Sequence, residues 1–356
     1  MSVKNVAIVG LGIGKSHIEE AYSKQPELFR VAAICDLNEA RLAEIGDAYG
    51  IARRTTSFDE VLAMQDIDIV DVCTPPGLHF EQIVASLKAG KHVICEKPLV
   101  GSLAQIDEVA AVERQSRGRV MPIFQYRFGN GFQKAKLLVD SGIAGRPYVA
   151  TAETFWTRGA AYYSVPWRGK VATELGGALL THAIHIHDML CGLIGDIESV
   201  AADAITRVNT IEVEDCAVAA LRMTNGALAS LAVTLGSSRE MSRLHIAFEN
   251  VTMESSHAPY SPGDEPWTFI PANDEAKARI EEAFASFEPV PRRFAGQMLR
   301  YHAALDAGTD FPVTLADARR SLELITALYA SSDTGQRIRL PIAAGHDRYA
   351  NWTRRG

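Results

Sequence analysis

The segment Gly90-Lys91-His92-Val93-Ile94-Cys95-Glu96-Lys97-Pro98 predicts a strand that ends in two charged residues and a proline. Valine and isoleucine favour a covered, pleated surface, so His92 to Cys95 is expected to be a buried strand. The proline ends it, because it cannot donate the next hydrogen bond. Glu96 and Lys97 therefore stand at the carboxyl end of a strand, the edge where open α/β sheets bind ligands. A solvated ion pair at a strand end is the alternative interpretation.

Composition narrows the class of protein. The chain has 356 residues, which predicts two domains of about 100–200 residues each. Hydrophobic residues make up 47% and charged residues 22%, as in ordinary globular proteins. The net charge of −7 and the lack of a basic stripe argue against a nucleic-acid partner. No apolar run approaches the ~20 residues that span a membrane, no signal peptide is recognisable, and the scattered cysteines form no C-x-x-C pair. We therefore expect a cytoplasmic protein with reduced thiols.

A glycine-rich segment follows the first predicted strand, Val3 to Val9. Gly10-Leu11-Gly12-Ile13-Gly14 lies between that strand and a helix pattern from Ile18 to Tyr22. Strand, glycine turn and helix are the context of a dinucleotide-binding fingerprint, in which the backbone approaches a pyrophosphate at a helix N-terminus. The third glycine stands one position earlier than in G-x-G-x-x-G. We predict cofactor contacts from Gly10, Gly12, Ile13 and Gly14.

Asp36 directly follows the next predicted strand, Phe29 to Cys35. It lies close to the spacing of about 20 residues at which an acid beyond the fingerprint holds the ribose hydroxyls of NAD. A carboxylate there repels the 2′-phosphate of NADP. The alternative role is to cap the following helix, since aspartate is a favoured cap. With the glycine turn upstream, the sequence favours NAD over NADP.

Strands and helices alternate through the first third of the chain. Further strands are predicted at Ile67 to Cys73 and Val120 to Gln125, with helices between all the strands. This alternation predicts a doubly wound domain with a parallel sheet, residues 1–125. The loops after parallel strands share one edge, which places Lys97 beside the cofactor together with the stiff loop Thr74-Pro75-Pro76 and His79.

These motifs resemble one known family over nearly the whole chain. The glycine turn, the strand-end acid, Thr74-Pro75-Pro76 with His79, and Ala89-Gly90-Lys91-His92-Val93 leading to Glu96-Lys97-Pro98 are similar to the glucose–fructose oxidoreductase, inositol dehydrogenase and rhizopine catabolism (Gfo/Idh/MocA) family. The resemblance implies a Rossmann domain, a catalytic Lys97 and a Lys97–Pro98 bond that is often cis. It also implies that Trp167 and Arg168 lie near cofactor and substrate.

The second part of the chain, residues 126–356, has a different pattern of apolar and polar residues. Alternating patterns predict strands at Tyr148 to Trp156, Ser199 to Arg207, Val213 to Met223, Ala227 to Leu235 and Leu244 to Phe248. Asn225-Gly226 is a strong hairpin signal, so the sheet is expected to be open and mostly antiparallel within an α+β domain. We expect a long loop from Ser255 to Asp274 and late amphipathic helices that dock back on the first domain. The resemblance implies a homodimer or homotetramer formed through this sheet.

Gly176-Gly177 opens a segment that is predicted as one helix through Leu190. Thr181, His185 and Asp188 fall at i, i+4 and i+7 and would share one face. The resemblance makes His185 the catalytic histidine and Asp188 the last acid of the motif, while Thr181 stands where aspartate is commonest. A threonine can hydrogen-bond a substrate but cannot ionise. The three histidines of this segment do not share one face, so no metal site is predicted.

Aromatic side chains between residues 156 and 169 suit the apolar faces of a sugar ring, although packing is an equal alternative. The predicted cofactor site consists of Gly10, Gly12, Ile13, Gly14, Asp36, Thr74, Pro75, Pro76, His79, Glu96, Lys97, Gln125, Trp167 and Arg168. The predicted substrate site consists of Lys97, Arg127, Trp156, Tyr163, Trp167, Thr181 and His185.

The predicted function is an NAD(P)-dependent dehydrogenase that oxidises a hydroxyl of a neutral sugar or cyclic polyol, with an aldose oxidised at C1 to a lactone as one candidate. Histidine has an ordinary pKa of about 6.5, so His185 would be the base, and Lys97 would stabilise the alkoxide and relay the proton. One alternative is NAD-assisted sugar elimination or glycoside cleavage, which releases no NADH in bulk. Another is a non-catalytic NAD-binding sugar sensor.

Overall fold

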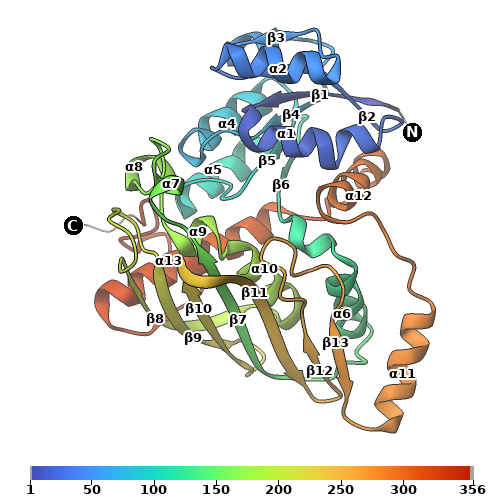
Figure 1. The fold of residues 1–356 in the computed structure, drawn as a ribbon, viewed down its shortest axis with the longest axis vertical. Helices are drawn as coiled ribbons and strands as arrows, with labels where there is room; N and C mark the ends of the chain where they lie inside the picture. Colours follow the sequence, from blue (N-terminus) through green and yellow to red (C-terminus); the bar gives the residue numbers. More distant parts are fainter. Residues whose placement is uncertain (1, 353–356) are drawn as a thin grey trace. The chain divides into compact units, whose positions relative to one another are not determined.

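The computed structural model of the protein describes residues 2–352 and divides into two compact units (Figure 1). The first unit comprises the residues up to Ile123 together with Phe294–Arg319. The second comprises Phe124–Arg293 and the residues from Arg320 onward. A late segment of the chain thus belongs to the core of the amino-terminal unit.

The first unit is a parallel sheet with helices between its strands. Its strands are β1 (Lys4–Val9), β2 (Phe29–Cys35), β3 (Arg54–Thr55), β4 (Ile69–Val72), β5 (His92–Cys95) and β6 (Val120–Pro122). Its helices are α1 (Leu11–Glu20), α2 (Glu39–Tyr49), α3 (Phe58–Ala63), α4 (His79–Lys88), α5 (Leu103–Glu113) and α12 (Arg293–Ala307), with short 3₁₀ turns at Tyr22–Lys24 and Pro76–Leu78. The strand order β3-β2-β1-β4-β5-β6, with every neighbouring pair parallel, confirms the predicted doubly wound fold.

Local sequence explains where the helices of this unit begin. Side chains of Asn38, Ser57 and Ser102 accept a backbone N–H from the first turn of α2, α3 and α5. The strands β1, β4 and β5 are apolar and largely buried, as expected for a sheet covered on both faces. Helix α12 completes this core: the Gln297 side chain donates to the Pro122 carbonyl at 2.8 Å.

The second unit is built on an eight-stranded sheet. Its strands are β7 (Pro147–Thr157), β8 (Ile197–Ile205), β9 (Cys216–Met223), β10 (Leu228–Thr234), β11 (Gly236–Phe248), β12 (Val251–Glu254), β13 (Thr268–Pro271) and β14 (Ile338–Arg339). Its helices are α6 (Asn130–Asp140), α7 (Ala160–Tyr163), α8 (Val171–Glu174), α9 (Ala178–Thr181), α10 (Ile184–Ile194), α11 (Asp274–Ala285) and α13 (Leu315–Thr334), the last of which begins in the first unit, with a 3₁₀ turn at Gln125–Phe128.

The order of this sheet is β13-β12-β11-β7-β10-β9-β8-β14. Only β7 and β10 are parallel neighbours among these strands, so the predicted mostly antiparallel sheet is confirmed. The predicted hairpin is also confirmed, because Asn225-Gly226 joins β9 to β10 and Gly226 has a φ of 89°. Helices α9 and α10 pack against the strands at the centre of this sheet (Figure 1).

Three local predictions were wrong. The segment from Ala178 to Leu190 is two helices, α9 and α10, with a break at His182 and Ala183, so its residues do not share one continuous helical face. The predicted loop Ser255 to Asp274 contains the strand β13, which pairs with β12. Strand β11 begins eight residues before its predicted start at Leu244, because the polar residues from Gly236 extend its pairing with β7 past an irregularity.

All five cysteines are free thiols, as predicted, and four of them are buried. Within residues 2–352, no single helix has the length and apolar composition to cross a membrane. The helical segments Val171–Thr181 and Ile184–Ile194 have this length and composition only when they are counted as one bent pair.

Candidate active site

The glycine turn is the first part of a helix. Helix α1 begins at Leu11, not at Ile18 as predicted, so Gly12, Ile13 and Gly14 form its first turn. Gly10 has a φ of 92°, and a Cβ there would lie 2.7 Å from the backbone of Cys73. A Cβ on Gly12 would meet nothing within 4 Å, and Gly12 and Ile13 are exposed. The turn therefore presents an open helix N-terminus, as a pyrophosphate requires.

Asp36 is tied to this turn. Its Oδ2 accepts the Leu11 N–H at 2.8 Å and pairs with the Arg41 guanidinium at 3.1 Å, while its Oδ1 accepts the Asn38 N–H at 2.8 Å. The side chain that caps α2 is Asn38, not Asp36. The capping alternative for Asp36 is therefore excluded, and the carboxylate remains beside the start of α1.

The loop after β4 is joined to the loop after β5 by one histidine. The His79 ring is buried, with Nδ1 at 2.8 Å from the Pro98 carbonyl and Nε2 at 2.8 Å from the Thr74 carbonyl. Burial lowers the pKa of His79. Pro75 is half-buried, Pro76 is buried, and the Lys97–Pro98 bond is cis. His79 thus fixes the backbone on both sides of the predicted site.

Glu96 and Lys97 follow β5 as predicted, but the Glu96 side chain turns inward. Its Oε1 lies 3.2 Å from His17 Nε2, and its Oε2 accepts the Lys97 N–H at 3.1 Å. Burial acts to raise the pKa of Glu96, but the hydrogen bonds from His17 and Lys97 and the charges of both residues together outweigh it, so the pKa lies below its ordinary value of 4.5. Lys97 itself is half-buried. The pair is therefore not a solvated ion pair.

Within the first unit the structure brings the predicted residues to one edge. The strands β1, β4 and β5 are adjacent, with β2 on the other side of β1. Because all these strands are parallel, the loops that follow them meet at the same carboxyl edge. The residues there are Gly10, Gly12, Ile13, Gly14, Asp36, Thr74, Pro75, Pro76, His79, Glu96 and Lys97.

In the second unit, His185 lies in the first turn of α10 and is buried. Its ring stacks on Tyr126 at 4.4 Å between centroids, with the edge of Phe124 at 6.1 Å. One turn further along, the Asp188 carboxylate receives both Nε and Nη2 of Arg127, at 2.6 and 2.5 Å. Arg127, which the sequence assigned to substrate, is thus held by a buried acid.

Thr181 lies at the end of α9, so the helix break separates it from His185. Its hydroxyl lies 2.8 Å from the Gly177 carbonyl and 2.7 Å from His182 Nδ1. The His182 ring in turn meets the Trp156 ring edge-on at 5.2 Å. Two predicted substrate residues, Thr181 and Trp156, are therefore connected through His182, which was not among the predicted site residues.

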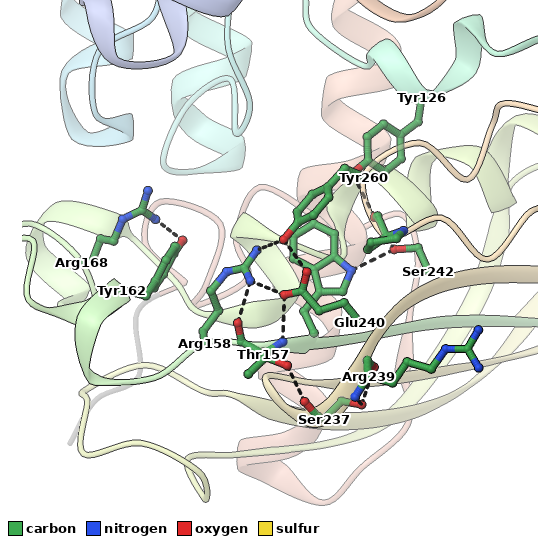
Figure 2. A network of polar contacts seen from close by, with 12 residues as sticks. Tyr126, Thr157, Arg158, Tyr162, Arg168, Ser237, Arg239, Glu240, Ser242 and Tyr260 are labelled. Carbon is green, nitrogen blue, oxygen red and sulfur yellow. Dashed lines mark hydrogen bonds and ion pairs between the residues drawn. The ribbon is translucent and has the colours of Figure 1, made fainter.

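Arg158 lies at the centre of a polar network at the end of β7 (Figure 2). Its guanidinium pairs with Glu240 at 2.6 Å and donates to the Tyr260 hydroxyl at 3.0 Å, and that hydroxyl donates to Glu240 at 2.6 Å. The guanidinium carbon lies 4.9 Å from the centre of the Trp156 ring, whose Nε1 donates to Ser242. The arginine charge is thus balanced by one carboxylate and surrounded by aromatic rings.

Arg168 forms a second such group. Its guanidinium donates to the Tyr162 hydroxyl (Figure 2) and pairs with the buried Glu174 carboxylate at 3.6 Å. The guanidinium carbon lies 3.9 Å from the centre of the Tyr162 ring and 4.4 Å from the centre of the Trp167 ring. Tyr163 packs edge-on against Tyr162 at 5.0 Å, and burial raises its pKa. The structure therefore gathers Trp167, Arg168 and Tyr163 in one aromatic segment, as the sequence suggested.

Gln125 is buried, and its Oε1 has no hydrogen-bond partner within the described part of the chain. A buried amide oxygen without a partner is costly in a folded protein. Such an atom is an indication that a ligand group or water completes the site at this residue.

Sequence reasoning missed several residues that contact predicted site residues within their own unit. His17 bonds to Asp71 Oδ2 at 2.8 Å and to Glu96, and Tyr22 donates to Asp71 at 2.7 Å. Asp71 carried a signal, because a charged residue within the apolar strand at 67–73 is rarely buried without a partner. Arg158 had no such signal in the sequence, since a lone arginine beyond a strand end has no distinctive pattern.

One group of side chains has the composition of a metal site. Among the described residues, only His17, Asp71 and Cys73 bring three possible ligand atoms within 4.8 Å of one another. These atoms already contact each other, with Cys73 Sγ at 3.5 Å from His17 Nδ1 and at 3.4 Å from Asp71 Oδ1. Direct hydrogen bonds account for the arrangement.

The parallel sheet, the open glycine turn and the strand-end acid define an NAD-binding oxidoreductase of the Rossmann class. Residues 4–124 match the oxidoreductase family with an NAD-binding Rossmann fold, GFO_IDH_MocA, and residues 132–254 match the GFO/IDH/MocA C-terminal domain. The chain belongs to the Gfo/Idh/MocA family, which confirms the resemblance.

Several characterised proteins are similar to it. D-glucoside 3-dehydrogenase of Escherichia coli (strain K12) is 26% identical over 94% of this chain and 97% of that protein. Myo-inositol 2-dehydrogenase of Thermotoga maritima is 31% identical over 63% of this chain and 66% of that protein. The WlbA dehydrogenase of Bordetella pertussis, solved with NADH and UDP-GlcNAcA, superposes with a TM-score of 0.84 at 28% identity over 96% of this chain and all of that chain.

Proposed function

We propose that the protein is an NAD-dependent dehydrogenase that oxidises a hydroxyl of a neutral sugar or cyclic polyol. The observation that carries this proposal is the position of Lys97 in the first unit. Lys97 follows β5, two strands from β1, whose end carries the open glycine turn, and the Glu96 side chain fixes its backbone N–H. A lysine at the carboxyl edge that binds a dinucleotide is placed for chemistry on a substrate beside that cofactor.

The proposed cofactor is NAD, which supplies a nicotinamide ring that accepts hydride. The residues fit a dinucleotide, because the first turn of α1 is open at Gly12 and offers backbone N–H groups to a diphosphate. The Asp36 carboxylate would hold the ribose hydroxyls and disfavour a 2′-phosphate. Gln125, whose buried Oε1 needs a donor, is proposed to complete the cofactor site together with Trp167 and Arg168.

The proposed chemistry uses two protein groups on one substrate hydroxyl. The hydroxyl must lose a proton as hydride leaves its carbon, and His185 is proposed as the base. The Lys97 ammonium would stabilise the developing alkoxide and relay the proton. Stacking on Tyr126 and burial on α10 fix the plane of the His185 ring, as a base with a defined approach requires.

A neutral substrate is proposed because three arginines that belong to, or contact, the predicted site residues of the second unit are each paired with an acid. Arg127 pairs with Asp188, Arg158 with Glu240 and Arg168 with Glu174. An anionic substrate would need a cation with no partner of its own. The aromatic rings around Arg158 and Arg168 suit the C–H faces of a sugar. The similar proteins named for glucoside and inositol substrates support the same class.

The test is a screen of aldoses, methyl glucosides, levoglucosan and inositols with NAD, followed by the absorbance of NADH. The proposal predicts stoichiometric release of NADH with at least one neutral sugar or polyol. A product that forms without bulk NADH would favour transient oxidation within an elimination or glycosidase reaction. Binding of both ligands without any product would favour a sensor.

We also propose that the part of residues 126–356 that forms the second unit provides both substrate binding and assembly. One face of the eight-stranded sheet exposes Val149, Val218 and Leu228, each at about half of its full exposure, on strands that are paired side by side. A second copy of the chain would cover this face. A substitution such as Val218→Asp is expected to shift the protein from dimer or tetramer to monomer in size-exclusion chromatography with light scattering. A wild-type monomer would contradict the proposal.

A further inference from the structure

Five polar side chains form a buried group in the first unit, here named the His17 cluster: His17, Tyr22, Asp71, Cys73 and Glu96. None of them is more than 6% exposed. His17 belongs to α1, Tyr22 to the turn after it, and the others to β4, its end and the end of β5. The cluster therefore lies beneath the edge that carries the glycine turn and Lys97, although the proposed reaction uses none of its members directly.

His17 is held between two acids. Its Nδ1 lies 2.8 Å from Asp71 Oδ2 and its Nε2 lies 3.2 Å from Glu96 Oε1. Ionised carboxylates only accept hydrogen bonds, so both ring nitrogens must carry a proton. Burial acts to lower the pKa of His17, but the charge and hydrogen bond of Asp71, together with those of Cys73, outweigh it, so the pKa lies well above its ordinary value of 6.5. The ring is therefore an imidazolium with two charge-assisted hydrogen bonds.

Such a cluster is a poor means of stabilising a core. Two carboxylates and one imidazolium are removed from water, and the cost of removing buried charges from water often exceeds their mutual attraction. The Phe294 ring of α12 lies 4.4 Å from the His17 ring and covers it. Apolar side chains of similar size would fill this place at a lower cost, so the charges point to a role in the site above them.

Glu96 connects the cluster to the reacting lysine. One of its carboxylate oxygens faces the His17 ring, and the other accepts the backbone N–H of Lys97. Since His17 is part of α1, this single side chain joins the helix that begins at the glycine turn to the backbone of Lys97. Tyr22 and Cys73 hold Asp71 in turn, through hydrogen bonds to its two oxygens.

We propose that His17 is a positioning residue of the dehydrogenase: its doubly protonated ring fixes Glu96, and Glu96 fixes the backbone from which Lys97 reaches the substrate. The inference rests on the proposed catalytic role of Lys97. It assigns no contact between His17 and substrate or cofactor. Loss of the ring should therefore misplace the ammonium group of Lys97 and leave the helix N-terminus that binds NAD in place.

The test compares His17→Gln with a matched control, His302→Gln. His302 is also a fully buried histidine of the first unit, but its Nε2 faces the Ser2 carbonyl at 3.0 Å. With the best sugar from the screen, His17→Gln should lower kcat by about 10- to 100-fold, the cost of misplacing a catalytic group by about 1 Å. NAD affinity, followed by fluorescence quenching, should change by less than about threefold.

A double-mutant cycle identifies the route of the effect. If His17 acts through Lys97, His17→Gln should cost nothing further in a Lys97→Ala background. An equal loss with and without Lys97, or a loss no larger than that of His302→Gln, would overturn the inference. Should His17→Gln fail to fold, Asp71→Asn removes the other carboxylate that holds the His17 ring and must show the same split between kcat and NAD affinity. Full turnover by Lys97→Ala alone would instead reject the proposed function.

Discussion

Glu214→Gln is a substitution whose effect on stability should depend on pH. The Glu214 carboxylate is buried and accepts the N–H groups of Gly177 and Leu179 at 3.0 and 2.9 Å, as well as the Tyr329 hydroxyl. It therefore holds the start of α9, the helix that ends in Thr181. Burial raises the pKa of Glu214 from 4.5 to about 7.

The sign of the pH dependence follows from this raised pKa. Between about pH 4.5 and pH 7 the folded protein keeps the proton on Glu214, while the unfolded chain loses it. The contribution of Glu214 to stability is thus complete below pH 4.5 and decreases as the pH rises to about 7. The difference between the two pKa values corresponds to about 3 kcal/mol in the free energy of unfolding.

Glutamine cannot ionise, so the free energy of unfolding of Glu214→Gln should not show this decrease as the pH rises. Its amide will also disturb the two backbone hydrogen bonds, at a cost of about 1–3 kcal/mol that does not vary with pH. Urea unfolding followed by far-UV circular dichroism, at a series of pH values, measures both components. Glu212→Gln is the control, since Glu212 is exposed two residues away. Parallel stability profiles for Glu214→Gln and wild type would show that Glu214 does not titrate with a raised pKa in the folded protein.

Three further substitutions have defined outcomes. Asp36→Ser should raise the preference for NADP over NAD by about fivefold or more in steady-state kinetics, since a nearby unit charge in water is worth about 1 kcal/mol; an unchanged ratio would remove Asp36 from cofactor selection. Gly177→Ala places a Cβ 1.9 Å from a backbone oxygen and should lower stability by about 1–3 kcal/mol in thermal unfolding, whereas Gly159→Ala, with open space around its Cβ, should not. Arg127→Met removes the guanidinium from the buried carboxylate of Asp188 and should cost about 3–5 kcal/mol, with partial recovery in a double variant that adds Asp188→Leu.

The first unit was predictable because its signals are local. The strand at 92–95 and the glycine turn at Gly10 can be recognised from residues that are adjacent in the sequence. The rules for connecting parallel strands then leave few possible sheet topologies. The predicted start of α1 was too late because the glycines of its first turn have low helix propensity. In the structure the helix begins at Leu11, which is buried and whose N–H donates to Asp36. A long-range contact decided the boundary.

In the second unit, the break between Thr181 and His185 had no signal in the apolar periodicity. The structure shows that Glu214, far along the chain, holds the start of α9, while the Thr181 hydroxyl bonds back to Gly177. The Arg158 network was equally hidden, because its partner Glu240 comes from a distant strand. Such pairs depend on strand register, which no short window of sequence contains.

The most informative single measurement is the rate of hydride transfer in one turnover. Wild type, Lys97→Ala and His185→Ala would each be mixed with NAD and the best sugar, and NADH absorbance followed by stopped flow. We expect each substitution to slow this step by about 10²- to 10⁴-fold while NAD still binds. A wild-type rate in either variant would contradict the assignment of Lys97 and His185 to the same reaction.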